Sequence, residues 1–105
     1  MSRIGITNGN GEWFDTAKAT LIKEYVYHNG RNFISKATDS QFEHEWLYIT
    51  ASNKYVLHCY SNYQGVPSTY EIIESEEAAK WFSKQGFSKE DIPQELLSDV
   101  NKFEI

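Results

Sequence analysis

The chain has 105 residues, a formal net charge of −5 and a single cysteine. This length suits a single domain over residues 1–105, without a separate catalytic lobe. The basic residues are scattered singly, which argues against direct nucleic-acid binding, and one cysteine excludes an internal disulfide. Neither a membrane helix nor a signal peptide is indicated, so we expect a cytosolic protein that does not associate with membranes.

Asparagine and glycine turns organise the N-terminal half. Residues 3–14 predict a hairpin around an Asn-Gly repeat, because Asn-Gly supplies the left-handed backbone that tight turns need. Residues 15–19 predict a connector in which Asp15 caps a helical turn. A second hairpin is predicted with strands at residues 21–28 and 32–36.

The central stretch predicts three strands that follow one another as a meander. Aromatic and β-branched residues fill residues 42–50 and 54–61 on either side of a short polar turn. Gly65 and Pro67 then mark a second break before residues 68–73.

The register of the first of these turns is left open. A two-residue loop places Leu47 opposite His58, whereas a three-residue loop places Trp46 there. In the second case His44 shares a sheet face with His58. The register therefore decides whether the two histidines can be neighbours.

The C-terminal third changes to a helical period. Residues 75–85 predict a helix that Ser75 caps and Gly86 ends, with Trp81 and Phe82 as its anchors on the sheet and Phe87 folded back onto Phe82. A second short helix follows Pro93 and presents Leu96, Leu97 and Val100, and residues 102–105 either add an edge strand or fray. The predicted fold class is α+β: an antiparallel sheet of about five to seven strands, with the C-terminal helix packed on one face.

One part of the chain resembles a known group of proteins. It reads Trp-Leu-Tyr-Ile-Thr-Ala-Ser-Asn-Lys-Tyr-Val-Leu-His over residues 46–58, then Ser61, Gln64-Gly65, Tyr70-Glu71 and Glu77-Ala-Ala-Lys-Trp81. This is similar to a group of small bacterial proteins with Leu-Tyr-x-Thr and Trp-Val-Leu-His strands, a Ser-x-Trp-x-Gly loop and a Glu-Ala-Ala-x-Trp helix. Here Tyr55, Tyr60 and Tyr63 stand where tryptophan is more usual. The resemblance covers about residues 13–86 and implies a common fold, but no activity is established for the group and no catalytic residue follows.

The histidines and the cysteine do not assemble a site locally. Alternating strand residues point to opposite faces, so His44 diverges from Glu43 and Glu45, and His58 diverges from Cys59. Catalytic motifs with a linear signature are also missing from the sequence. We assign no catalytic, metal-binding or cofactor-binding residue, and the sequence favours a non-enzymatic protein without excluding an enzyme.

The aromatic residues around the central strands carry the functional prediction. Tyrosine and tryptophan offer large rigid surfaces with one polar end, and they dominate recognition surfaces. The sequence favours an interaction module, such as a regulator or inhibitor, that binds another protein through Trp46, Tyr48, His58, Tyr60, Tyr63, Gln64 and Tyr70. The alternative is a small-molecule binder or enzyme with a pocket under the helix, built from Tyr48, His58, Tyr60 and Tyr70. A homodimer through an edge strand is a third use of the same region.

Overall fold

The computed structural model describes residues 3–63 and 65–105 and has an α+β architecture. Within these ranges the strands are β1 (Arg3–Gly5), β2 (Trp13–Asp15), β3 (Thr20–Lys23), β4 (Val26–His28), β5 (Phe33–Ser35), β6 (Glu43–Ile49), β7 (Tyr55–Ser61) and β8 (Thr69–Ile73). The helices are α1 (Ser75–Gln85) and α2 (Leu97–Asn101), with 3-10 turns η1 (Thr16–Lys18), η2 (Lys89–Asp91) and η3 (Gln94–Leu96). The predicted fold class is confirmed, with eight strands in the described ranges against the expected five to seven.

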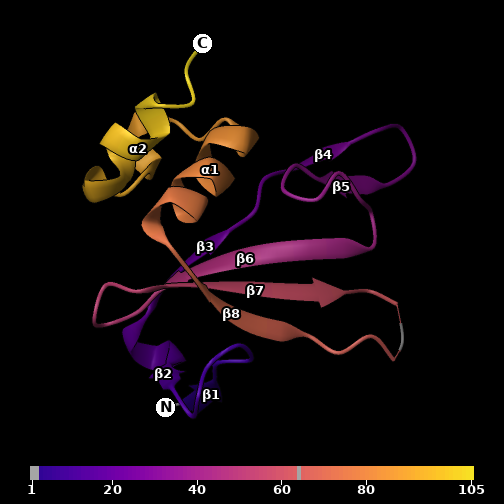
Figure 1. The fold of residues 1–105 in the computed structure, drawn as a ribbon. Coiled ribbons are helices and arrows are strands. Elements are labelled where there is room, and N and C mark those ends of the chain that lie inside the picture. Colours follow the sequence, from indigo (N-terminus) through magenta and orange to yellow (C-terminus); the bar gives the residue numbers. More distant parts are fainter. Residues whose placement is uncertain (1–2, 64) are drawn as a thin grey trace.

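The central sheet has four strands in the order β3-β6-β7-β8, and all neighbours are antiparallel (Figure 1). The predicted meander of β6, β7 and β8 is confirmed, and β3 adds to its free side through β6. The central positions of β6 and β7 agree with their apolar and aromatic content on both faces.

A three-residue turn joins β6 to β7 and settles the register. The Thr50 N–H donates to the Lys54 carbonyl oxygen at 2.9 Å, which leaves residues 51–53 as the loop. Asn53 adopts a left-handed backbone with a φ of 62°, which asparagine tolerates better than most residues. Trp46 consequently pairs with His58, as in the second of the two alternatives.

Helix α1 covers the sheet face that carries Leu47 and Tyr55. Its buried residues Trp81 and Phe82 join these strand residues in the main apolar core, together with Ala37, Ala78, Ile92 and Leu96. Gly86 ends the helix with a left-handed φ of 75°, and the Phe87 ring packs against Phe82 with centroids 5.0 Å apart. The predicted helix, anchors and glycine stop are confirmed, but Glu74 rather than Ser75 is the N-cap.

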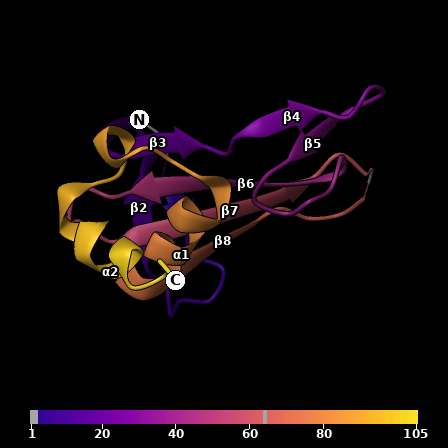
Figure 2. The ribbon, with the colours of Figure 1, turned by 90° about the horizontal axis from the view of Figure 1, so that it is seen from above.

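The β1–β2 hairpin lies across the opposite side of the sheet from the helices (Figures 1 and 2). Its buried Phe14 contacts the rings of Tyr48 and Tyr70, with centroids 5.1 and 6.2 Å apart. The segment after β1 runs along the outer edge of β8. Thr7 exchanges two hydrogen bonds with the Tyr70 backbone, and the Asn8 side chain exchanges two with the Ile72 backbone. The backbone groups that β8 turns outward at these residues are thereby satisfied.

The second predicted hairpin is only partly correct. Strands β4 and β5 do pair, with Tyr27 opposite Ile34, and they extend beyond one end of the sheet (Figure 2). Residues 20–23 instead form β3, which pairs with β6. The chain changes partner at Glu24 and Tyr25, where the Tyr25 N–H donates to Gln85 Oε1 and its ring stacks on Phe87 at 3.9 Å. These contacts interrupt the strand that the sequence predicts over residues 21–28.

The remaining short segments follow the prediction in outline. Asp15 caps η1 by accepting a hydrogen bond from the Ala17 N–H. The second helix begins as η3 after Pro93 and continues as α2, with Leu96 fully buried. Residues 102–105 add no strand to the sheet, and all four are exposed.

Candidate functional site

Five of the predicted surface residues share one face of the central sheet. Directly paired residues of antiparallel strands point to the same side, and His58 pairs with Trp46 on β6 and with Tyr70 on β8. Tyr48 and Tyr60 lie two residues along from these positions and therefore point the same way. We call this set the aromatic face: Trp46, Tyr48, His58, Tyr60 and Tyr70.

The rings of the aromatic face contact one another and form one cluster. His58 lies at the centre, stacked on Tyr70 with centroids 4.1 Å apart and planes 6° from parallel. Trp46 meets His58 and Tyr60 edge-on, at 6.1 and 5.4 Å. The Lys23 ammonium lies 5.1 Å from the Trp46 ring centroid, within the range of a cation–π contact. Each ring is thus held in place by its neighbours.

The aromatic face is only partly covered. Helix α1 packs on the other face, and the β1–β2 hairpin covers the end around Tyr48 and Tyr70 through Phe14. All five side chains are half-buried, in contrast to Leu47 and Phe82 in the core, which are 0 % exposed. A cluster of partly exposed rings in mutual contact therefore remains at the surface.

Tyr63, another predicted surface residue, does not belong to this cluster. Tyr63 is 57 % exposed beyond the end of β7 and stacks on Phe42, with centroids 4.3 Å apart. The sequence grouped Tyr63 with the sheet because it follows β7 directly, but its ring packs on Phe42 instead. The last predicted surface residue, Gln64, lies outside the described residues.

His58 is a neutral base within the cluster. Its Nδ1 atom is buried and has no hydrogen-bond partner among the described residues. Burial lowers the pKa of His58 below its usual value of 6.5, so the imidazole is uncharged at neutral pH. The ring contributes flat aromatic surface together with one unused polar atom.

Cys59 points to the face opposite His58, as expected from strand alternation. Its Sγ lies 3.8 Å from Glu45 Oε2. Burial, reinforced by the nearby Glu45 carboxyl, raises the pKa of the Cys59 thiol to about 11. A thiolate is the reactive form of cysteine, so this environment opposes a nucleophilic role at neutral pH.

A buried hydrogen-bonded pair that sequence reasoning missed, Glu24 with His44, joins the residue after β3 to β6. Glu24 Oε2 lies 2.5 Å from His44 Nδ1, and the two side chains are only 4 % and 11 % exposed. Glu24 Oε1 also accepts hydrogen bonds from the Ser35 hydroxyl and the Glu45 N–H. The signal available was strand alternation, which places Glu24 on the same inward side as Ile22.

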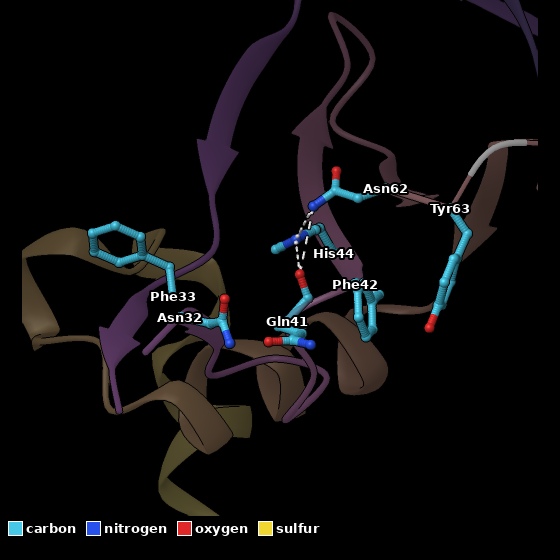
Figure 3. Close-up of a pocket in the computed structure, with 7 residues that line it drawn as sticks. All are labelled: Asn32, Phe33, Gln41, Phe42, His44, Asn62 and Tyr63. Atoms are coloured by element: carbon cyan, nitrogen blue, oxygen red, sulfur yellow. Dashed lines mark hydrogen bonds between the residues drawn. The ribbon is translucent and has the colours of Figure 1, made fainter. Parts of the chain in front are cut away.

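This pair links the β4–β5 hairpin to the sheet and positions the His44 ring. Its Nε2 lies 3.1 Å from the Gln41 carbonyl oxygen and 3.2 Å from Asn62 Nδ2 (Figure 3). A protonated Nε2 donates to Gln41, whereas a bare Nε2 accepts from Asn62. His44 and His58 share a sheet face, as the three-residue turn requires, and Tyr60 contacts both rings.

The alternative pocket beneath the helix cannot be built from the residues predicted for it. Tyr48, His58, Tyr60 and Tyr70 point away from α1, because the register turns Leu47 and Leu57 toward the helix. Two pockets instead lie at opposite ends of the sheet. One, of about 390 Å³, includes His44, and the other, of about 460 Å³, lies between the β1–β2 hairpin and the β6–β7 turn.

The described part of the chain contains no cluster of three or more histidine, cysteine or acidic side chains placed to hold a metal ion. Over residues 3–63 and 65–105, no helix combines the length and apolar character that crossing a membrane requires. In comparisons with known proteins, the chain matched no family model, no curated protein and no solved structure. The resemblance noted in the sequence therefore stays a prediction.

Proposed function

We propose that the protein is a non-enzymatic interaction module that binds another protein through the aromatic face. The observation that carries this proposal is the cluster of contacting, half-buried rings on the sheet face that α1 leaves uncovered. Buried aromatic anchors supply much of the binding energy in protein interfaces.

The geometry of the face supports a broad contact over a small-molecule site. Of three pockets with volumes of about 290, 390 and 460 Å³, none is lined by Trp46, Tyr48, His58 or Tyr70, and Tyr60 lines the smallest of the three. The rings also lose little conformational freedom on binding, because each is already fixed by its neighbours. A partner that covers the face gains apolar contact at a low entropic cost.

The test compares three tagged proteins in pull-downs from a lysate of the native host. They are the wild type, the face variant Trp46→Ala/Tyr60→Ala, and the control variant Trp13→Ala/Tyr27→Ala. The control removes the same two residue types from exposed positions outside the face, where Trp13 and Tyr27 are 53 % and 45 % exposed. Circular dichroism and urea unfolding check that both variants are folded.

We expect the wild type and the control variant to retain a common protein that the folded face variant loses. The identified protein is then purified and titrated against all three by isothermal calorimetry, where the face variant should bind at least about tenfold more weakly. Equal binding by the face variant, or no retained protein with any of the three, would contradict the proposal.

A further inference from the structure

The pocket beside His44 lies apart from the aromatic face and has a different character. It has a volume of about 390 Å³, which falls within the range of small-molecule sites. The β4–β5 hairpin supplies one side, and the start of β6 and the end of β7 supply the other (Figure 3). Its lining residues are Asn32, Phe33, Gln41, Phe42, His44, Asn62 and Tyr63.

Two side-chain amides in this pocket have no partner. In the described part of the structure, neither the Asn32 nor the Gln41 side-chain amide makes a hydrogen bond, although the backbones of both residues do. Figure 3 shows these amides between Phe33 on one side and Phe42 with Tyr63 on the other. Each amide offers one acceptor and an NH₂ donor, so together they can bind a planar group that presents both along one edge.

Aromatic rings flank these amides. Phe42 and Tyr63 stack with centroids 4.3 Å apart and planes 26° from parallel, which fixes both rings on one side of the pocket. Phe33 on the other side is 64 % exposed and contacts His28 edge-on at 4.9 Å. Exposed faces of this kind are suited to stacking on a flat heterocycle.

His44 fixes the back of the pocket through the buried Glu24 carboxylate. Because Glu24 holds Nδ1, the ring has one orientation, and Nε2 is directed toward the Gln41 carbonyl and the Asn62 amide. The Asn62 amide and the Gln41 backbone are therefore held in place before any ligand arrives. Asn62 Oδ1 remains free, within the described residues, as a further acceptor.

The lining carries no lysine, arginine, aspartate or glutamate among its described residues. A phosphate or a carboxylate would find no cationic side chain there. The pocket instead matches an uncharged ligand that is flat and has alternating donors and acceptors along its edge. Adenine has this chemistry, since its N6 amino group and N7 acceptor pair with a carboxamide through two hydrogen bonds.

We propose that this pocket binds an uncharged nucleoside through its base, with adenine preferred. The Gln41 amide pairs with the N6/N7 edge while the base stacks on Phe42. The same base chemistry occurs in free adenosine, in adenine nucleotides and in RNA. The absence of cationic lining residues in the described pocket favours adenosine over the phosphorylated forms.

The experiment is a titration of the ¹⁵N-labelled full chain with adenosine, followed through the side-chain amide signals in NMR spectra. We expect shifts at Asn32, Gln41 and Asn62 at millimolar adenosine, and none with ribose, which lacks the base. Gln41→Ala should weaken binding about tenfold, as for loss of a bidentate amide contact. Phe42→Ala should weaken it by a similar factor through loss of stacking.

Gln94→Ala serves as the matched control, because Gln94 is an exposed glutamine on η3 outside the pocket. It should leave the adenosine affinity unchanged. His44 is not substituted, because its loss would leave the buried Glu24 without its partner and would destabilise the fold. The variants chosen leave the Glu24 and His44 side chains in place.

Three results would overturn the proposal: no shift of the pocket amides at millimolar adenosine, shifts confined to residues outside the pocket, or variants Gln41→Ala and Phe42→Ala that both bind adenosine as tightly as the wild type does. A further arm uses adenosine monophosphate and a short adenine-rich RNA. If either bound much more tightly than adenosine, the preference for an uncharged nucleoside would be refuted. These results are independent of the pull-downs, because neither Trp46 nor Tyr60 lines this pocket.

Discussion

On one face of the central sheet, Leu47 lies beneath α1 and is fully buried, whereas on the other face the neighbouring Trp46 is half-exposed. The two faces come from the same strands, since successive side chains alternate between them. One face packs aliphatic residues against Trp81 and Phe82, and the other packs aromatic rings mainly against one another. The difference indicates that stability depends chiefly on the helix-covered face, which leaves the aromatic face available for recognition.

The largest expected effect is on the covered face. Phe82→Ala removes a fully buried ring between α1 and the sheet and should lower the free energy of unfolding by about 3–5 kcal/mol. Urea unfolding followed by tryptophan fluorescence at neutral pH measures this change. A loss below about 1 kcal/mol, as at a surface position, would mean that the ring does not anchor the helix.

The next largest effect concerns the buried Glu24–His44 pair at the end of the sheet. His44→Ala leaves the Glu24 carboxyl buried without its imidazole partner and should cost about 3 kcal/mol. We expect the lower part of the usual range, because Glu24 keeps the hydrogen bonds from Ser35 and from the Glu45 N–H.

A double-mutant cycle separates this pairing from simple loss of packing. The variant Glu24→Ala/His44→Ala should be destabilised by clearly less than the sum of the two single variants. Additive losses would show that the two side chains do not stabilise each other.

The aromatic face should respond weakly to the same kind of truncation. Tyr60→Ala removes a half-buried ring and should lower the free energy of unfolding by about 1 kcal/mol. The measurement is the same urea titration as for Phe82→Ala, so the two faces are compared directly. A loss as large as that of Phe82→Ala would remove the distinction between the faces.

The smallest effect is a pH dependence that belongs to His58. Burial lowers its pKa in the folded protein below the usual 6.5, so the unfolded chain binds a proton at a higher pH than the folded chain does. Stability should therefore fall as the pH decreases through about 6.5. Near this pH the fall should be shallower in His58→Phe, which keeps an aromatic ring but removes the titrating group.

The comparison between wild type and His58→Phe cancels the contributions of the other titrating groups. Among these is Glu45, whose pKa is raised by burial above its usual value of 4.5. Its contribution to stability therefore rises as the pH falls, which is opposite to the contribution of His58. Identical slopes in the two proteins between neutral pH and about pH 6 would show that His58 titrates alike in the folded and unfolded states.

Local signals predicted most of the fold. The Asn-Gly turns, the polar break before β7 and the glycine after α1 each fix a backbone geometry within a few residues, and the structure places an element boundary at each. The register of β6 and β7 was harder to predict, because both of the possible loop lengths place aromatic residues on each face of the sheet. Asn53, which has a left-handed backbone in the structure, belongs to the loop in both alternatives and so did not select between them.

Long-range contacts account for what the sequence did not reveal. Glu24 and His44 are twenty residues apart, and neither lies in a motif that marks a buried carboxyl–histidine pair. The split between β3 and β4 depends on Gln85, sixty residues beyond Tyr25, whose side chain binds the Tyr25 N–H. The aromatic face was anticipated because its residues cluster in sequence, whereas the His44 pocket combines segments from both halves of the chain.

The hydrogen bonds that Thr7 and Asn8 make along β8 also limit how the sheet can grow. They occupy the outward backbone groups of Tyr70 and Ile72, which an added strand would need. Within the described four-stranded sheet, edge-to-edge association is therefore favoured at β3, the border opposite β8. Two copies joined at β3 would present two β8 borders whose outward groups at Tyr70 and Ile72 are already occupied, which opposes further growth of this sheet.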